Sequence, residues 1–245
     1  MTAVVIVFAA ALATALATGL GALPLAFTPH PGTGRLATAN ALAAGFMVGA
    51  AGGLVVEGMR GGVGRTLIGV AVGWGAMGLV DRVAGGQGEP QFGALRGADA
   101  TRALMIVGVM TAHSTAEGVG VGVSFGSTQA FGLLIAVAIA VHNIPEGLAI
   151  SLVLVPRGLS VRRAAAWSVF SSLPQPLLAV PAFLFVETFQ SLLPAGLGFA
   201  AGAMTWLAVT RLVPEAVRGS ARIRVAAVAL PAAAAMLVFQ LLLVR

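Results

Sequence analysis

Apolar residues form long, uninterrupted stretches, and polar residues gather in short segments between them. A helix needs about 20 mostly apolar residues to cross a bilayer. The runs lack the apolar and polar alternation of membrane-spanning strands. The pattern therefore predicts an all-α membrane protein with eight transmembrane helices, over about 3–27, 36–57, 66–81, 102–125, 129–155, 161–186, 192–213 and 225–244.

Composition supports this class. Of the 245 residues, 58% are hydrophobic and only 9% are charged, whereas a soluble domain carries about 25% charged residues. This excludes a soluble enzyme, a nucleic-acid-binding protein and a disordered chain. The absence of cysteine excludes a disulfide framework and thiolate metal ligands. The first apolar run lacks a charged leader, so we expect a spanning helix there and not a cleaved signal.

The polar connections bear on domain organisation. The longest runs from Asp81 to Arg102 and is rich in glycine, so we predict a flexible cytoplasmic loop over about 82–101. The other connections are short and leave no room for a second domain. We therefore expect residues 1–245 to form a single transmembrane domain, a bundle with no large extramembrane part.

The basic residues predict how the bundle is oriented. All 14 are arginines. With eight spans, eleven arginines fall in the odd-numbered loops, and the other side holds only Arg60, Arg65 and Arg245. Arginine-rich loops face the cytoplasm, so we expect both termini outside it. The net charge of +6 is then a signal of topology and not of an acidic partner.

Glycines recur at every fourth position in two of the spans. This spacing lets helix backbones approach closely in lipid, and the same smooth faces could instead let one helix group slide past another. The two stripes are Gly45, Gly49 and Gly53 in the second span, and Gly118, Gly122 and Gly126 in the fourth.

Two acidic residues lie deep inside apolar spans. Glu117 follows His113 by four residues, and Glu146 follows His142 by four. Residues at this spacing share one helix face. The repeated pattern His-x-x-x-Glu-Gly occurs 29 residues apart on consecutive spans, which run in opposite directions. Repeats that meet near the membrane midplane are a common way to build a transport site.

A buried carboxylate is costly unless it is paired. A divalent cation would balance both glutamates, and the imidazoles suit Zn²⁺, Fe²⁺, Mn²⁺ or Co²⁺. We therefore predict a metal site formed by His113, Glu117, His142 and Glu146, with structural His–Glu hydrogen bonds as the alternative. The third histidine, His30, stands in a Pro/Gly-rich loop. We expect it to be solvated, with a weak entry or exit ligand as the alternative.

Prolines mark two further points along the chain. Pro145 frees the carbonyl of Val141 and predicts a kink that widens the ligand face. Pro174 and Pro176 flank Gln175, which predicts a broken or kinked sixth span. A buried glutamine needs partners for its amide, so Gln175 is either an interhelical hydrogen-bonding residue or an oxygen ligand or gate beside the His/Glu cluster.

These features resemble the ZIP family (Zrt/Irt-like proteins) of divalent metal transporters, over essentially the whole chain. The segment 142–149 is similar to the family's fifth-span signature, and 113–118 to its fourth-span partner. Segments 173–176, 199–204 and 212–216 are similar to motifs of the sixth and seventh spans. The resemblance implies a metal site between the fourth and fifth spans with help from the sixth, and alternating access as the transport mechanism.

The resemblance also implies supporting ligands, which this chain alters. Many members hold two metals, and the positions of Ser114, Asn143 and Gln175 often contribute ligands there. All three are neutral here, so the two glutamates balance one divalent ion and a second would be costly. We predict one high-affinity metal. Thr210 and Arg211 stand where an auxiliary site often lies, which argues against that site here. Glu57 is a solvated helix cap or a vestibule acid.

The main hypothesis is a transporter, not an enzyme, that moves a divalent metal into the cytoplasm. Zn²⁺ is the expected ion, with Fe²⁺, Mn²⁺, Co²⁺ and Cd²⁺ as alternatives, and no resident cofactor is expected. The partners are the bilayer and a second copy in a homodimer, with no nucleic acid. We place it in a prokaryotic cytoplasmic (inner) membrane. The competing hypotheses are a membrane-embedded zinc hydrolase and haem bound by His113 and His142.

Overall fold

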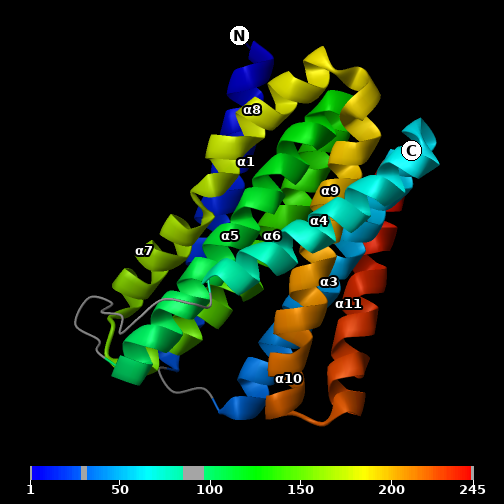
Figure 1. Ribbon diagram of the computed structural model, residues 1–245. Coiled ribbons are helices and arrows are strands. Elements are labelled where there is room, and N and C mark those ends of the chain that lie inside the picture. The colour runs from blue at the N-terminus through cyan, green and yellow to red at the C-terminus, as the bar shows by residue number, and fades with distance from the viewer. Residues whose placement is uncertain (1, 29–31, 85–96, 244–245) are drawn as a thin grey trace.

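The computed structural model describes residues 2–28, 32–84 and 97–243, and these form helices joined by short turns, with no strand among them. Figure 1 shows the helices as one elongated bundle. Their bounds are α1 Thr2–Leu20, α2 Leu23–Phe27, α3 Thr33–Gly61, α4 Val63–Ala84, α5 Gly97–Ser127, α6 Gln129–Leu154, α7 Val161–Ser172, α8 Pro174–Thr188, α9 Leu193–Leu207, α10 Val213–Gly219 and α11 Arg222–Leu243.

The predicted class of multi-helix membrane bundle is confirmed. Within the described residues, six stretches are long and apolar enough to cross a bilayer, and residues 63–79 form a shorter apolar helix. The α5 helix lies where we expect the fourth span. Eight crossings, and termini outside the cytoplasm, stay predictions. Helix covers both ends of the predicted loop 82–101, since α4 ends at Ala84 and α5 begins at Gly97; residues 85–96 lie outside the described part.

Side-chain polarity is arranged as a bilayer requires. Large apolar side chains point outward, among them Phe27, Leu177 and Ile223, at 88%, 67% and 77% exposure. Polar side chains such as His113 and Gln175 are fully buried. A surface so apolar is stable only against lipid or another protein. The bundle is therefore an integral, multi-pass membrane protein whose polar side chains face its interior.

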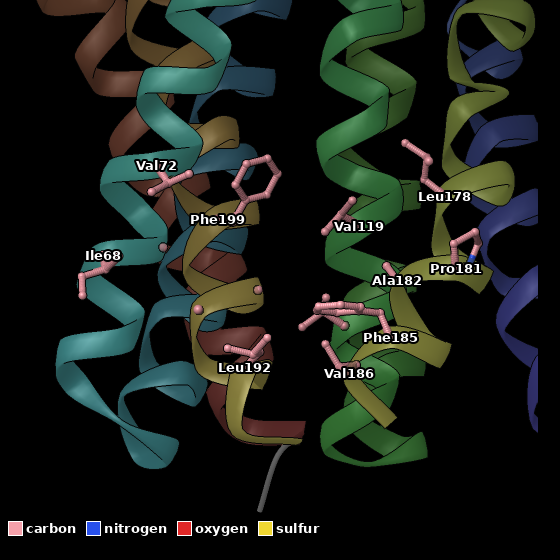
Figure 2. Close-up of a pocket in the computed structure, with 14 residues that line it drawn as sticks. Ile68, Val72, Val119, Leu178, Pro181, Ala182, Phe185, Val186, Leu192 and Phe199 are labelled. Carbon is pink, nitrogen blue, oxygen red and sulfur yellow. The ribbon is translucent and has the colours of Figure 1, made fainter. Parts of the chain in front are cut away.

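The helices form two groups. The first contains α1, α5, α6, α7 and α8, and the second contains α3, α4, α9, α10 and α11. The groups meet along a seam where α6 contacts α3 and α5 contacts α9. An apolar pocket opens at this seam, between α4 and α9 on one side and α5 and α8 on the other (Figure 2). The predicted metal ligands all belong to the first group.

The glycine stripes pack helices within each group. A Cβ atom at Gly45 or Gly49 would lie within 2.5 Å of a backbone oxygen of α11. One at Gly122 would lie 2.1 Å from a backbone oxygen of α8. The predicted close packing is therefore confirmed. Neither contact lies at the seam, so Gly45, Gly49 and Gly122 hold each group together.

Prolines lie in the two spans that we expected to be irregular, and a π turn lies in the seventh predicted span. Helix α7 ends at Ser172 and α8 begins at Pro174, so the predicted break in the sixth span is confirmed. Pro145 lies inside α6 without ending it. A π-helical turn over Ala208–Leu212 joins α9 to α10, just before Pro214. Such turns are often found near functional sites.

Candidate metal centre

The hairpin of α5 and α6 brings the two His-x-x-x-Glu-Gly motifs together. Thr128 alone separates the helices, and its hydroxyl caps α6 by accepting a 3.1 Å hydrogen bond from the amide of Phe131. His113 lies fifteen residues before Thr128, and His142 fourteen after it. Antiparallel helices with the same rise per residue therefore place both histidines at the same level.

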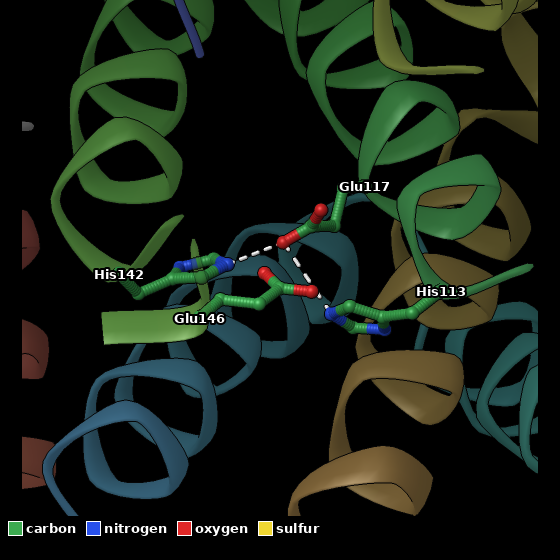
Figure 3. Close-up of side chains that lie close together, drawn as sticks. All are labelled: His113, Glu117, His142 and Glu146. Carbon is green, nitrogen blue, oxygen red and sulfur yellow. Dashed lines mark hydrogen bonds and ion pairs between the residues drawn. The ribbon is translucent and has the colours of Figure 1, made fainter. Parts of the chain in front are cut away.

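The four predicted ligands converge on one point (Figure 3). His113 and Glu117 extend from α5, and His142 and Glu146 from α6. One donor atom from each lies within 4.8 Å of all the others, and all four side chains are buried. Nε2 of His113 lies 3.4 Å from Oε1 of Glu117, which also contacts Nε2 of His142. The spacing of four residues thus builds one cluster.

Glu146 differs from Glu117 in its surroundings. Both of its carboxylate oxygens are buried, and neither has a hydrogen-bond partner among the described residues. In a low-dielectric interior, each buried polar group without a hydrogen-bond partner costs about 1–3 kcal/mol. An ionised carboxylate without a partner costs several kcal/mol. The centre therefore has unused carboxylate ligand atoms that a bound cation can engage.

Glu117, in contrast, is held by the sixth predicted span. The amide nitrogen of Gln175 donates a 2.6 Å hydrogen bond to Oε2 of Glu117. The Gln175 oxygen accepts a 3.2 Å hydrogen bond from Nδ2 of Asn143 and one from the hydroxyl of Thr14. Nδ2 of Asn143 also donates to the backbone oxygen of Thr14 at 2.9 Å. A polar network thus joins α1, α6 and α8 to one oxygen of Glu117.

The glycine that follows each glutamate is required by these contacts. A Cβ atom at Gly118 would lie 2.7 Å from the backbone oxygen of Gln175. One at Gly147 would lie 1.7 Å from the backbone oxygen of Thr18. Real Cβ atoms do not approach that closely, so the first glycine lets α8 reach the centre and the second lets α1 reach it. The motif therefore specifies both the ligands and the close packing around them.

The other predicted residues have different surroundings. Ser114 is buried, and neither its hydroxyl nor the side-chain oxygen of Asn143 has a hydrogen-bond partner among the described residues. His30 lies outside the described residues. Glu57 accepts hydrogen bonds from Ser127 of α5 at 2.6 Å and from Arg60 at 2.9 Å, so it joins the ends of α3 and α5. The hydroxyl of Thr210 donates to the backbone oxygen of Trp206, in the π turn.

Our reading of the sequence missed the contribution of α1. Thr14 contacts Gln175, and Thr18 lies 2.8 Å from the hydroxyl of Ser172 at the end of α7. Both threonines are fully buried. A signal was present, because two threonines four residues apart in an apolar span share one face. Such a face indicates a polar partner on a neighbouring helix.

Comparison with known proteins decides the family. Residues 87–240 match the family described as ZIP Zinc transporter. The chain belongs to this family. The matched region contains α5, α6 and α8, and with them all seven predicted site residues. Thr14 on α1 lies outside it.

Individual relatives carry related names. Over 229 residues the chain is 44% identical to a putative zinc transporter of Arabidopsis thaliana, covering 92% of this chain and 37% of that protein. It is 36% identical over 118 residues to the zinc transporter GufA of Myxococcus xanthus, covering 48% and 46%. It is 33% identical over 128 residues to the human zinc transporter ZIP11, covering 47% and 36%. The chain thus spans less than half the length of these ZIP relatives.

Proposed function

We propose that this ZIP protein transports a divalent transition metal, Zn²⁺ in the first place, across the membrane into the cytoplasm. His113, Glu117, His142 and Glu146 would bind the ion inside the bundle. The family and the names of the relatives support metal as the cargo. The excess of arginines in the odd-numbered loops supports entry into the cytoplasm.

The observation that best supports this proposal is that the buried carboxylate of Glu146 has no hydrogen-bond donor among the described residues. The donor set of two imidazoles and two carboxylates suits Zn²⁺, and Fe²⁺, Mn²⁺, Co²⁺ and Cd²⁺ share much of this preference. Zinc bonds of about 2.0–2.2 Å in a tetrahedron place donor atoms about 3.4 Å apart. The four donors already lie within 4.8 Å of one another. They need only small shifts to reach this separation, with Glu117 and His142 moving apart and the more distant donors moving together.

The remaining predicted residues would support these ligands. In this conformation Gln175 offers Glu117 a donor through its nitrogen, and its oxygen is engaged by Thr14 and Asn143. We assign it the role of orienting Glu117. The side-chain oxygens of Asn143 and Ser114, which have no hydrogen-bond partner in the described part of the chain, would serve as weak ligands while the ion enters or leaves.

The charge of the centre favours a single ion. Glu117 and Glu146 supply two negative charges, and no other acidic side chain belongs to the described cluster. One divalent ion neutralises the pair. A second would leave two uncompensated positive charges in a low-dielectric interior, which is strongly unfavourable.

The two helix groups support an alternating-access mechanism. All four ligands lie in the group of α1, α5, α6, α7 and α8, so movement of this group past the other would carry the ion with its complete coordination shell. Neutralising the carboxylates lowers the cost of exposing the centre to an apolar path.

The competing hypotheses receive less support from the geometry. A zinc hydrolase normally keeps three protein ligands and an open position for water, whereas four buried donors converge here. In a haem site the carboxylates would stand where the macrocycle must lie, since their oxygens are within 4.8 Å of the imidazoles. A Soret band or hydrolysis of an ester or amide by the purified protein would revive them.

Uptake of radioactive zinc into proteoliposomes tests the proposal. We expect saturable uptake by the wild-type chain, inhibited by competing divalent metals in the order of their affinity. Glu146→Gln and His142→Ala should each abolish it, whereas Glu57→Gln should not, because Glu57 lies at the helix ends. Unchanged uptake in the double variant of His142 and Glu146 would reject the site.

A further inference from the structure

The apolar pocket at the seam has the features of a binding site that the metal centre does not use. It has a volume of about 470 Å³ and is lined by residues of α4, α5, α8 and α9. Figure 2 shows its two walls facing each other, with Val72 and Phe199 on one and Val119 and Phe185 on the other. Its lining contains no charged side chain. Its ligand must therefore be apolar along this length.

The pocket is open to the membrane-facing surface. Ile68, Val72 and Phe185 line it and are 65%, 55% and 50% exposed. On α8 the lining extends from Leu178 to Val186, about 12 Å at 1.5 Å per residue. One leaflet contributes roughly 15 Å of hydrocarbon. The pocket therefore matches the length of an acyl chain within one leaflet.

A positive charge lies at one end of this pocket. Arg65 precedes Ile68 by one helical turn, and its guanidinium donates a 2.8 Å hydrogen bond to the backbone oxygen of Ser191, beside the lining residue Leu192. Arg65 is exposed and forms no ion pair with a described residue. Glu187 lies at the same end without pairing with it. An arginine has five N–H donors, so most remain open to a ligand.

An apolar pocket one leaflet deep with a guanidinium at its end complements an anionic phospholipid. We propose that the pocket binds one acyl chain of such a lipid and that Arg65 binds its phosphate. Guanidinium and phosphate form charge-assisted, often bidentate hydrogen bonds, and the chain would cover the exposed faces of Ile68, Val72 and Phe185. The lipid would then touch both helix groups at once.

This position gives the lipid a role in transport, an extension that rests on the proposed function. One wall belongs to the group with the metal ligands and the other to the second group. A chain between them would have to slide or leave whenever the groups move relative to each other. Occupancy of the pocket would therefore set how readily the two groups move.

Native mass spectrometry of the purified full chain tests the site. Palmitoyl-oleoyl phosphatidylglycerol and phosphatidylcholine are added separately at increasing concentration. We expect one tightly held phosphatidylglycerol per chain, with weaker retention of phosphatidylcholine. Arg65→Gln should lower the preference for phosphatidylglycerol about fivefold. Arg60→Gln is the matched control, because Arg60 lies at the same end of the bundle but pairs with Glu57.

Filling the pocket provides a second arm. Val72→Trp should abolish the tight phosphatidylglycerol, whereas Leu79→Trp, two turns along on the exposed face of the same helix and outside the lining, should not. If Val72→Trp misfolds, Ile68→Trp repeats the test. If both tryptophan variants misfold, the lipid preference of Arg65→Gln tests the site by itself. Equal binding of the two lipids by the wild type, or retained binding in Val72→Trp, would overturn the proposal. So would a dimer that carries no lipid and separates in Val72→Trp.

A transport measurement separates this inference from the proposed function. In phosphatidylglycerol vesicles, Val72→Trp should change the zinc uptake rate while leaving zinc affinity unchanged, because α4 holds no metal ligand. If lipid binds as described but no variant, the wild type included, takes up metal, then the proposed function fails and the lipid site stands.

Discussion

The amide nitrogen of Gln175 donates a 2.6 Å hydrogen bond to Oε2 of Glu117, so the sixth predicted span reaches the candidate metal centre as a hydrogen-bond donor. This bond leaves Oε1 of Glu117 for the imidazoles and for an ion. Because the side chain of Gln175 is a neutral amide, it adds no charge to the centre. The number of ions bound should therefore depend on this side chain.

Gln175→Glu should raise the number of bound zinc ions from one to two per chain. The new carboxylate removes a donor from Glu117 and adds the negative charge that a second divalent ion needs. Elemental analysis of protein equilibrated at low zinc concentration measures the stoichiometry. Gln175→Ala is the control and should stay at one. Two ions in the wild type at low zinc would contradict the charge argument.

Zinc should stabilise the folded wild-type protein. An ion at one hundred times its dissociation constant adds about 2.7 kcal/mol to the free energy of unfolding, and Glu146 has no other partner among the described residues. We expect the melting temperature in detergent to rise with zinc and to fall again with a chelator. The rise should vanish in Glu146→Gln and persist in Glu57→Gln. A full rise in Glu146→Gln would exclude this carboxylate as a ligand.

Gly118→Ala should destabilise the protein or displace α8, because its Cβ atom would lie 2.7 Å from the backbone oxygen of Gln175. Overpacking of this kind costs about 1–3 kcal/mol. Gly108→Ala on the same helix has nothing within 4 Å of the new atom and should be neutral. Thermal unfolding of the two variants compares them directly. Equal stability would show that the helices separate without cost.

Thr14→Val should weaken zinc binding although Thr14 is not a ligand. The change removes the hydroxyl that contacts Gln175 and with it one support of the network on Glu117. Loss of an outer support typically lowers metal affinity about 10–100-fold. Calorimetric titration with zinc measures this, and Thr14→Ser should restore the affinity by restoring the hydroxyl. If Thr14→Val binds zinc with wild-type affinity, the contact from α1 does not support the ligands.

Local patterns were sufficient for much of the fold. Apolar runs located the helices, because only a helix satisfies its own backbone within lipid. The break at Leu173 followed from Pro174, since proline cannot donate the backbone hydrogen bond of a continuing helix. The pattern was less informative at the ends of the segment 82–101, where α4 and α5 continue to Ala84 and from Gly97. Helix ends with mixed polarity carry little periodic signal.

The sequence by itself determined the donor set of the candidate metal centre, two histidines and two glutamates. A spacing of four fixes each His–Glu pair on one helix face, and the cost of carboxylates in an apolar span indicates a cation. Tertiary structure alone decided how the two glutamates differ. Gln175 and two histidines contact Glu117, while Glu146 has no donor among the described residues. That difference arises from contacts between helices far apart in the chain, which local spacing cannot encode.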